Sequence, residues 1–282
     1  MTETTNASAA KPSGSTKGSG FKSFISRYSP PILISLILLA GQLSFGMLMS
    51  YKAVILSVAT SMITEMILAR LLQNRWRNLS SAYISGISVS ILIRSTMLWP
   101  YVVTAMLSII SKYILQYKGR HIWNPSNFGV SWMLFTAPLS VAVLSIQWGN
   151  NMLPMLVIWV LGLVIVYRAK RYNITITYVL SFIFFALIRS YLTGDSFLAE
   201  VAPITGPMYQ LFIFFMITDP VTTVKSKKGQ VLVAFLIAFV EFILRMNQLI
   251  YAPFYALFLV GPVAMVIDLS RSKAGKPATA KT

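Results

Sequence analysis

The chain has 282 residues, of which 56% are hydrophobic and 11% are charged, and its mean hydropathy is +0.70. This composition excludes a soluble globular domain, because such domains carry about 25% charged residues. No cysteine is present, which excludes thiol-ligated metals, iron–sulfur clusters and disulfides. The net charge of +17 would suit a nucleic-acid partner, but the positions of the basic residues indicate another origin.

Apolar runs of close to twenty residues recur along the chain, and that length crosses a bilayer core of about 30 Å. We predict an all-α polytopic membrane protein whose ten-segment domain covers residues 30–269. A disordered basic tail over residues 1–29 precedes it, without the cleavage site of a secretory signal, and a basic tail over 270–282 follows it. The predicted segments are Pro30–Met49, Ala53–Leu72, Ser81–Ile93, Met97–Gln116, Phe128–Ile146, Asn151–Tyr167, Asn173–Tyr191, Thr205–Ile217, Gly229–Leu244 and Ile250–Leu269.

Basic residues test this topology independently, because cytoplasmic loops collect Lys and Arg. Alternate loops of the prediction, together with the two tails, hold 20 of the 24 basic residues. The other side holds only Lys52, Arg94, Arg189 and Arg245. This partition predicts that both termini are cytoplasmic, and it attributes the net charge to membrane topology.

Two predicted segments, Ser81–Ile93 and Thr205–Ile217, have only 13 residues and are too short to cross a bilayer alone. They are the third and the eighth, and both carry glycine, at Gly86 and Gly206. Short, interrupted segments at matching positions predict two inverted five-helix repeats, over 30–146 and 151–269, with the breaks facing an internal site. The alternative is a pair of short or tilted helices with no site.

The stretch from Phe214 to Thr223 runs from an apolar segment into a polar turn that holds one of the seven acidic residues. Either Thr218 or Asp219 can cap a helix N-terminus, and Pro220 suits the first helical position because it has no N–H to leave unpaired. The free amides of that first turn and the threonine hydroxyls would then form a donor-rich cup. A capped helix end without a ligand is the alternative.

A second polar stretch precedes the fifth segment. Asn124 followed by Pro125 repeats the pattern of a cap and a first-turn proline. Trp123 and Phe128 could pack on a planar ring or belong to the interfacial aromatic belt. His121 is the only histidine, so we expect a solvated or hydrogen-bonded loop residue and no metal site.

Two acidic residues fall inside predicted segments, where a charge is costly and often functional. Glu241 has a candidate partner one turn away in Arg245. Glu65 has only Arg70 nearby, out of ideal register. If ions or protons move through the protein, these two carboxylates are the candidates, whereas Lys112 is close enough to the boundary to snorkel.

Four sequence features resemble those of a known family: Gly119-Arg120 followed by Asn124-Pro125; Ser85-Gly86-Ile87-Ser88 ending near Arg94; the stretch Phe214–Thr223; and Gly229 opening a segment with Pro262 and Ile267-Asp268 closing the last. Over residues 30–270 the chain resembles the NqrB/RnfD family, the membrane subunits of sodium-translocating NADH:quinone reductase and of the Rnf complex. Within that family it resembles most the compact UnbU branch, found near enediyne biosynthesis genes.

The resemblance implies a ten-helix inverted-repeat fold that carries flavin in the membrane and passes electrons across it. Larger members attach flavin mononucleotide to threonine in a Ser-Gly-Ala-Thr motif between the two halves. Here that loop is only about Gln147–Asn150, and the nearest string, Ser57-Val58-Ala59-Thr60, lacks the glycine and lies in the second segment. We therefore expect non-covalent flavin, as FMN or riboflavin.

A flavin ring needs apolar or aromatic walls and hydrogen-bond donors at its carbonyls and N5. Helix N-termini would add positive potential for the reduced form. No acid–base pair or nucleophilic triad is assembled, so no catalytic residue is predicted. Phe214 and Phe128 are further candidate walls, and the predicted cofactor contacts are Gly86, Ser88, Gly119, Arg120, Trp123, Asn124, Pro125, Asn127, Phe215, Thr218, Asp219, Pro220, Thr222 and Thr223.

The resemblance thus predicts a flavin-dependent electron-transfer subunit of the bacterial cytoplasmic membrane, with coupling to cation movement left open. Its partners would be the lipid bilayer and redox proteins or other subunits, since the chain has no nicotinamide-binding domain. The alternative is a small-solute permease or channel on the same scaffold, because a scaffold does not fix a function.

Overall fold

The computed structural model describes residues 31–32, 34–36, 38–39, 50–143 and 152–274. Helices dominate this part of the chain, and the described residues between 31 and 39 are helical too. The bounds are α2 Tyr51–Gln73, α3 Ser80–Leu92, α4 Trp99–Ile114, α5 Pro125–Thr136, α6 Met152–Ala169, α7 Tyr172–Thr193, α8 Phe197–Val201, η1 Ala202–Thr205, α9 Pro207–Leu211, the π-helical η2 Phe212–Met216, α10 Lys227–Met246 and α11 Ala252–Ala274.

Four two-residue strands form two antiparallel pairs in the described residues. β1 (Ile93–Arg94) pairs with β4 (Ala142–Val143), and β2 (Gln116–Tyr117) pairs with β3 (Arg120–His121). The β2–β3 hairpin turns through Lys118 and Gly119, whose φ angles are 51° and 75°. Two residues with positive φ make the tight turn that suits a two-residue hairpin, and this accounts for the glycine.

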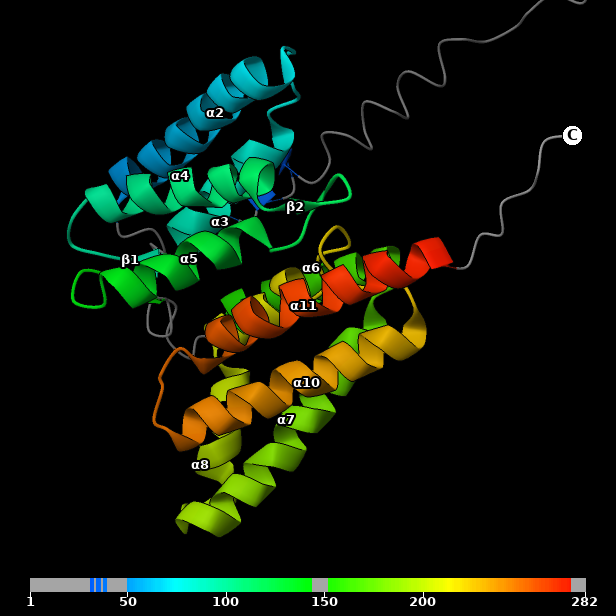
Figure 1. The fold of residues 1–282 in the computed structure, drawn as a ribbon. Helices are drawn as coiled ribbons and strands as arrows, with labels where there is room; N and C mark the ends of the chain where they lie inside the picture. The colour runs from blue at the N-terminus through cyan, green and yellow to red at the C-terminus, as the bar shows by residue number, and fades with distance from the viewer. Residues whose placement is uncertain (1–30, 33, 37, 40–49, 144–151, 275–282) are drawn as a thin grey trace, which may run out of the picture.

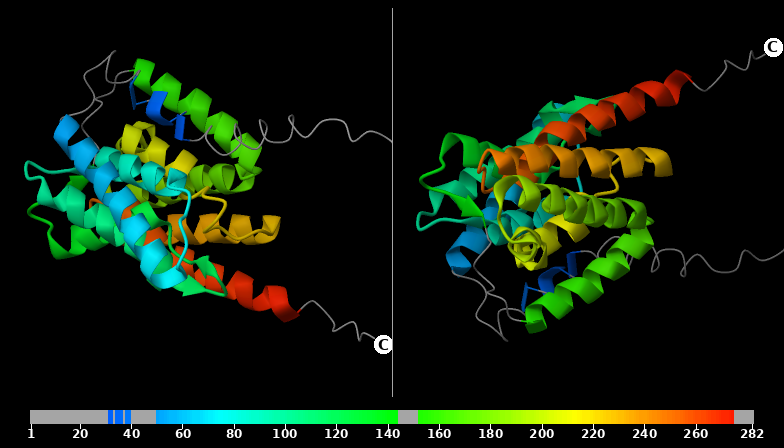
Figure 2. Two further views of the ribbon diagram at one scale, coloured as in Figure 1. Left: turned by 90° about the horizontal axis from the view of Figure 1, so that it is seen from above. Right: turned by 90° about the horizontal axis from the view of Figure 1, so that it is seen from below.

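The helices form two groups that pack in the same order along the chain. In the first group α2 packs on α3 and α4, and α4 packs on α5; in the second, α7 packs on α10, and α10 packs on α11. The groups meet where α5 lies against α11, as Figures 1 and 2 show. The pair α9 and η2 packs on α6 at the edge of the second group.

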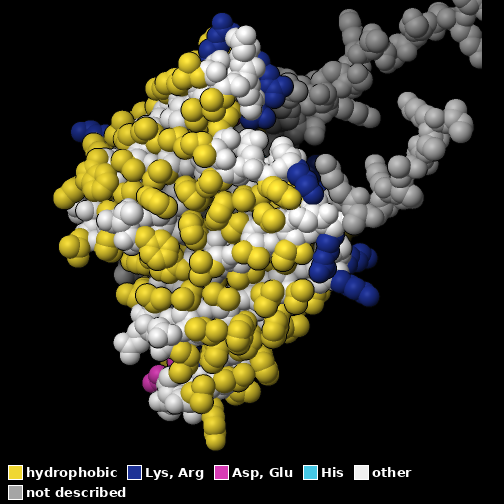
Figure 3. All heavy atoms as spheres, viewed as in Figure 1, with side chains coloured by type: hydrophobic (Ala, Val, Ile, Leu, Met, Phe, Trp, Pro, Cys, Tyr) yellow, Lys and Arg dark blue, Asp and Glu magenta, His cyan; other side chains and the backbone are white. Residues whose placement is uncertain are grey.

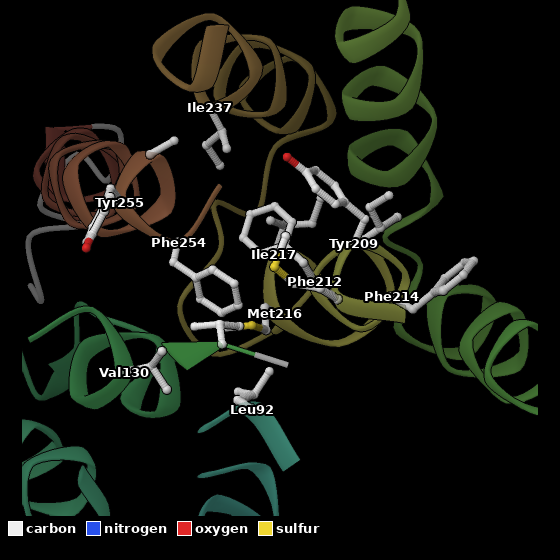
Figure 4. Close-up of a cluster of buried hydrophobic side chains, with 14 of the residues drawn as sticks. Leu92, Val130, Tyr209, Phe212, Phe214, Met216, Ile217, Ile237, Phe254 and Tyr255 are labelled. Carbon is white, nitrogen blue, oxygen red and sulfur yellow. The ribbon is translucent and has the colours of Figure 1, made fainter. Parts of the chain in front are cut away.

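A buried apolar cluster joins the two groups. In Figure 4, Leu92 from α3 and Val130 from α5 face Phe212, Met216 and Phe254 of the second group. Phe212 and Phe254 are fully buried. In a bilayer, close van der Waals packing of such aromatic side chains contributes to the contact between the groups.

The described residues contain four helices long and apolar enough to cross a membrane: α2, α7, α10 and α11 over Ala252–Arg271. A fifth span is counted if the pair Phe197–Thr205 and Met208–Met216, bent by 60°, crosses as one unit. Large apolar side chains cover much of the visible surface in Figure 3. A surface of this kind is typical of a protein embedded in lipid.

Several predicted boundaries differ from the structure. α3 has the expected 13 residues but runs unbroken through Gly86, whereas the eighth segment is broken next to Gly206 as predicted. The predicted segment Phe128–Ile146 is wrong, because α5 begins at Pro125 and ends at Thr136. Pro138 explains this end, since the residue before a proline is disfavoured in the helical region.

The ends of the domain differ in smaller ways. α11 continues to Ala274, past the predicted end of the last segment at Leu269. The tail over residues 1–29, most of the first predicted segment and the loop Gln147–Asn150 lie outside the described residues.

One end of the molecule collects basic side chains, and we call it the basic end. It holds the α2–α3 turn, the β2–β3 hairpin, the turn over residues 219–226 that leads into α10, the α6–α7 turn and the C-terminal part of α11. Lys118 Nζ donates to the Leu269 carbonyl at 2.6 Å, which joins the hairpin to α11. Figure 3 shows Lys and Arg gathered toward this end, on the right and at the top of the view.

Candidate functional site

Asn124 caps α5 as the sequence predicts. Its Oδ1 accepts a hydrogen bond from the Asn127 backbone N–H at 3.1 Å, and Pro125 occupies the first helical position. The cap satisfies one of the amides that a helix start leaves unpaired. The Asn124 side-chain amide group is thereby held at the edge of the first helical group.

Neither Thr218 nor Asp219 caps a helix, and Pro220 does not begin one, so that prediction is wrong. The Asp219 carboxylate accepts from the Val221 backbone N–H at 3.1 Å and from the Thr222 hydroxyl at 2.8 Å, which makes a turn. An Asp side chain bonded to its own backbone two residues on competes with helix formation. The following helix, α10, begins only at Lys227, with Ser226 as its cap.

The two polar stretches meet in space. Asn124 Nδ2 donates to Asp219 Oδ2 at 3.4 Å across 95 residues of sequence. Arginines hold the turn from two sides: the Arg120 guanidinium donates to the Val221 carbonyl, and Arg171 donates to the Val224 carbonyl at 2.7 Å and the Pro220 carbonyl at 3.3 Å. Arg120 therefore positions the turn.

A cavity of about 460 Å³ lies between the two helical groups where these residues meet. This volume falls in the range of small-molecule sites, about 300–1,000 Å³. One part of its lining is apolar and comes from α3, α6, α9 and η2; another part is rich in hydroxyl and charged groups. The apolar residues include Ile84, Ile91, Leu92, Ile158, Leu211, Phe215 and Met216, and the polar ones are Ser80, Ser81, Ser85, Ser88, Lys112, His121, Asn124, Ser126 and Asp219.

Lys112 supplies the buried positive charge of this cavity. It is 5% exposed, and its Nζ donates to Ser81 Oγ at 3.0 Å and lies 3.6 Å from Glu65 Oε2. The prediction that Lys112 snorkels is therefore wrong, because its carboxylate partner holds it inside. An ammonium has three N–H donors, so a ligand in the cavity can accept one.

Glu65 is the centre of this ion cluster. Tyr113 donates to Glu65 Oε1 at 2.8 Å, and Arg77 Nη1 lies 3.8 Å from the same oxygen. The sequence analysis considered Arg70 as the partner of Glu65, but in the structure the partners of Glu65 are Lys112 and Arg77. These are long-range partners that helix spacing on α2 alone does not reveal.

His121 lines the cavity from strand β3 and is half-buried. Burial lowers the pKa of His121 from its ordinary value, and the nearby Asp219 carboxylate partly opposes this shift. The imidazole is therefore neutral near pH 7 and offers one donor and one acceptor.

Five of the predicted cofactor residues line the cavity: Ser88, Asn124, Pro125, Phe215 and Asp219. Trp123, Asn124, Thr222 and Thr223 line a separate void of about 20 Å³, enough for a single water. The remaining predicted cofactor residues line neither the cavity nor the void: Gly86, Gly119, Arg120, Asn127, Thr218 and Pro220.

Gly86 has a packing role that excludes it from the predicted cofactor contacts. A Cβ at this position would lie 2.6 Å from Val58 Cα, so the missing side chain lets α3 cross α2 closely. Two other predicted contacts turn toward the backbone: Asn127 Nδ2 donates to the Phe254 carbonyl at 3.1 Å, and the Thr218 hydroxyl donates to the Phe214 carbonyl at 2.6 Å.

Of the candidate aromatic walls, only Phe215 faces the cavity. Phe214 packs against Gly162 of α6, where a Cβ would lie 2.5 Å from its ring. Phe128 stacks near Phe258, with ring centroids 5.7 Å apart, and Trp123 donates its indole N–H to the Phe258 carbonyl.

The sequence analysis predicted Ser88 as a cofactor contact but missed Ser81 and Ser85, which lie on the same face of α3. Ser81, Ser85 and Ser88 follow the spacing i, i+4 and i+7, which places them on one side of a helix, and all three line the cavity. A search for polar residues at helical spacing within an apolar segment could have found Ser81 and Ser85.

The second intramembrane carboxylate forms a cluster of its own. Glu241 is buried, accepts hydrogen bonds from the Tyr178 and Tyr209 hydroxyls, and pairs with Arg245 at 3.1 Å. The partner expected one turn away is confirmed. Arg245 sits near the end opposite the basic end, where it also lies over the Tyr209 ring.

Comparison of the sequence with family models and with curated proteins finds no match. The resemblance to the NqrB/RnfD family therefore rests on the residues quoted for it.

Proposed function

We propose that this chain is a membrane-embedded electron-transfer subunit that holds a flavin non-covalently in the 460 Å³ cavity. The observation that carries the proposal is the meeting of Asn124 and Asp219 at a cavity that is apolar on one side and donor-rich on another. A flat ring with polar edges has this combination of surfaces. When bound, the flavin would supply one- and two-electron chemistry.

The residues present fit such a group. Phe215 and the aliphatic side chains of α3 offer walls for the ring. Lys112, Asn124 and the α3 serines offer hydrogen bonds to its carbonyls or to a terminal phosphate. The positive charge of Lys112 would also stabilise the negative charge of a reduced flavin ring. The contribution of this chain is therefore to bind, orient and electrostatically stabilise the flavin.

The wider architecture belongs to the same proposal. The repeated packing order of α2–α4–α5 and α7–α10–α11 supports a pair of inverted five-helix repeats with ten segments. The collection of Lys and Arg at the basic end supports a cytoplasmic location for that end and for both termini, in a bacterial inner membrane. Redox proteins or other subunits would then exchange electrons there, and Glu65 and Glu241 remain the candidates for a cation path.

The test is the pigment of the purified protein. Protein extracted in mild detergent should show the blue absorption band of oxidised flavin, and acid precipitation should release the pigment into the supernatant. Pigment that stays with the precipitate contradicts non-covalent binding. A colourless protein that does not take up added FMN or riboflavin contradicts the proposal.

A permease for a small solute is the second candidate, because the cavity lies between the two helical groups, where transporters built from repeats bind their substrates. The two proposals predict different results for protein reconstituted into proteoliposomes. Electron transfer from an external reductant to a trapped acceptor requires bound flavin, whereas solute uptake by flavin-free protein supports the permease.

A further inference from the structure

A second hollow lies near the α2–α3 turn, where Arg77 forms an ion pair with Glu65. It is a groove of about 840 Å³ between the described helical residues within 31–39, the α2–α3 turn and the neighbouring parts of α2 and α3. A hydrogen bond of 2.7 Å between the hydroxyls of Ser35 and Tyr83 holds its two walls together. We call it the Trp76 groove.

One wall of the Trp76 groove is an apolar stripe. Ile32, Leu36 and Leu39 follow the spacing of one helix face, and each side chain is more than half exposed, at 54%, 56% and 55%. Met62 of α2 adds to the lining. Such a surface matches a hydrocarbon chain.

The part of the Trp76 groove next to Arg77 is polar and positively charged. Trp76, which is 70% exposed, and Arg77 line it. The Arg77 guanidinium is fixed by Glu65 at 3.8 Å and by the Tyr113 ring, whose centroid is 5.8 Å away. A guanidinium has five N–H donors, more than these two neighbours can accept, and its planar fork matches a phosphate.

We propose that the Trp76 groove is a binding site for one anionic phospholipid, with an acyl chain along Ile32, Leu36 and Leu39 and the phosphate at Arg77. Basic pockets between helices on the cytoplasmic side of a membrane bind such headgroups, and an exposed tryptophan suits the interface. Apart from Ser80, which lines both spaces, this site and the flavin cavity have different linings, and the proposal does not depend on the proposed function.

Charge complementarity selects the lipid over two other occupants. The N-terminal residues 1–29 contain four basic residues and one acidic residue, so they would bring further positive charge to Arg77. A second copy of the chain would bring another basic end in the parallel orientation that a membrane imposes. The negatively charged phosphate of an anionic lipid would instead neutralise the positive charge of Arg77.

The test uses full-length, delipidated protein in a neutral detergent and native mass spectrometry during titration with dioleoyl phosphatidylglycerol or dioleoyl phosphatidylcholine. We expect one phosphatidylglycerol to bind about tenfold more tightly than phosphatidylcholine. Arg77→Gln should remove most of this preference. Arg168→Gln, which removes an exposed charge at the same end but outside the groove, should keep it.

Leu36→Trp provides a second variant, because it narrows the apolar part of the groove and leaves the Arg77 ion pair intact. It should weaken phosphatidylglycerol binding even if Arg77→Gln fails to fold. Equal affinities for the two lipids, equal losses in Arg77→Gln and Arg168→Gln, or wild-type binding by Leu36→Trp would each overturn the proposal. So would inorganic phosphate that binds through Arg77 as tightly as the lipid.

Discussion

Asn124 and Asp219 belong to different helical groups and are joined by a hydrogen bond of 3.4 Å from Nδ2 to Oδ2. Asn124 also caps α5, and Asp219 also fixes the turn before α10. The pair thus ties a helix start in one group to a turn in the other. Because both residues line the 460 Å³ cavity, its shape depends on this contact.

Asp219→Ala should release the ligand of the cavity. The substitution removes the acceptor of Asn124, Thr222 and the Val221 N–H, and we expect about 1–3 kcal/mol of lost stability together with loss of bound flavin. The flavin-to-protein ratio after acid extraction measures the loss. Asp268→Asn, at the same end but outside the cavity, is the control and should keep the pigment.

Lys112→Met should weaken flavin binding by about 10- to 100-fold, since a charge-assisted hydrogen bond contributes roughly 1.5–3 kcal/mol. Glu65 keeps Arg77 and Tyr113 as partners in this variant, so the protein should still fold. Equilibrium titration with FMN measures the affinity. An unchanged dissociation constant would show that Lys112 does not contact the ligand.

Gly86→Ala should destabilise the protein by about 1–3 kcal/mol, because the added methyl group meets the α2 backbone 2.6 Å away. Thermal unfolding in detergent measures the change. The folded fraction should bind flavin normally, as expected for a packing residue and not for a cofactor contact. Gly261→Ala, whose Cβ would find an ordinary contact at 3.4 Å, is the matched control.

Glu241→Leu should cost about 3–5 kcal/mol, because it leaves Arg245 without its buried partner and two tyrosine hydroxyls without their acceptor. Replacing Arg245 by Leu as well should restore part of the loss. A double-mutant cycle in unfolding free energy measures the coupling. Additive effects would contradict a direct interaction.

His121 should make stability depend on pH. Burial lowers the pKa of His121 in the folded protein below its ordinary value of about 6.5, so the unfolded chain binds the proton first as the pH falls. Stability is therefore full above pH 6.5 and is lost progressively as the pH falls from there toward the folded pKa. His121→Gln should flatten the unfolding free energy over this window, and an unchanged slope would contradict the assignment.

Local patterns predicted part of the site well. Asn124 followed by Pro125 predicts a capped helix start, and the structure has one, since a cap depends only on residues a few positions apart. The same logic failed at Asp219, where Val221 and Thr222 capture the carboxylate in a turn. Lys112 and His121 were not predicted as cavity residues, because their partners come from distant segments.

The sequence by itself determined that this is a helical membrane protein, because the length and apolarity of α2, α7, α10 and α11 suffice to match a bilayer. It also determined that most basic side chains fall in alternate loops between the apolar segments and in the two tails. Tertiary structure alone decided that Glu65 pairs with Lys112, that Gly86 serves helix packing, and that the two polar stretches share one cavity. The physical reason is that periodicity specifies which face of a helix is buried, whereas the partner of that face depends on how all the helices pack together.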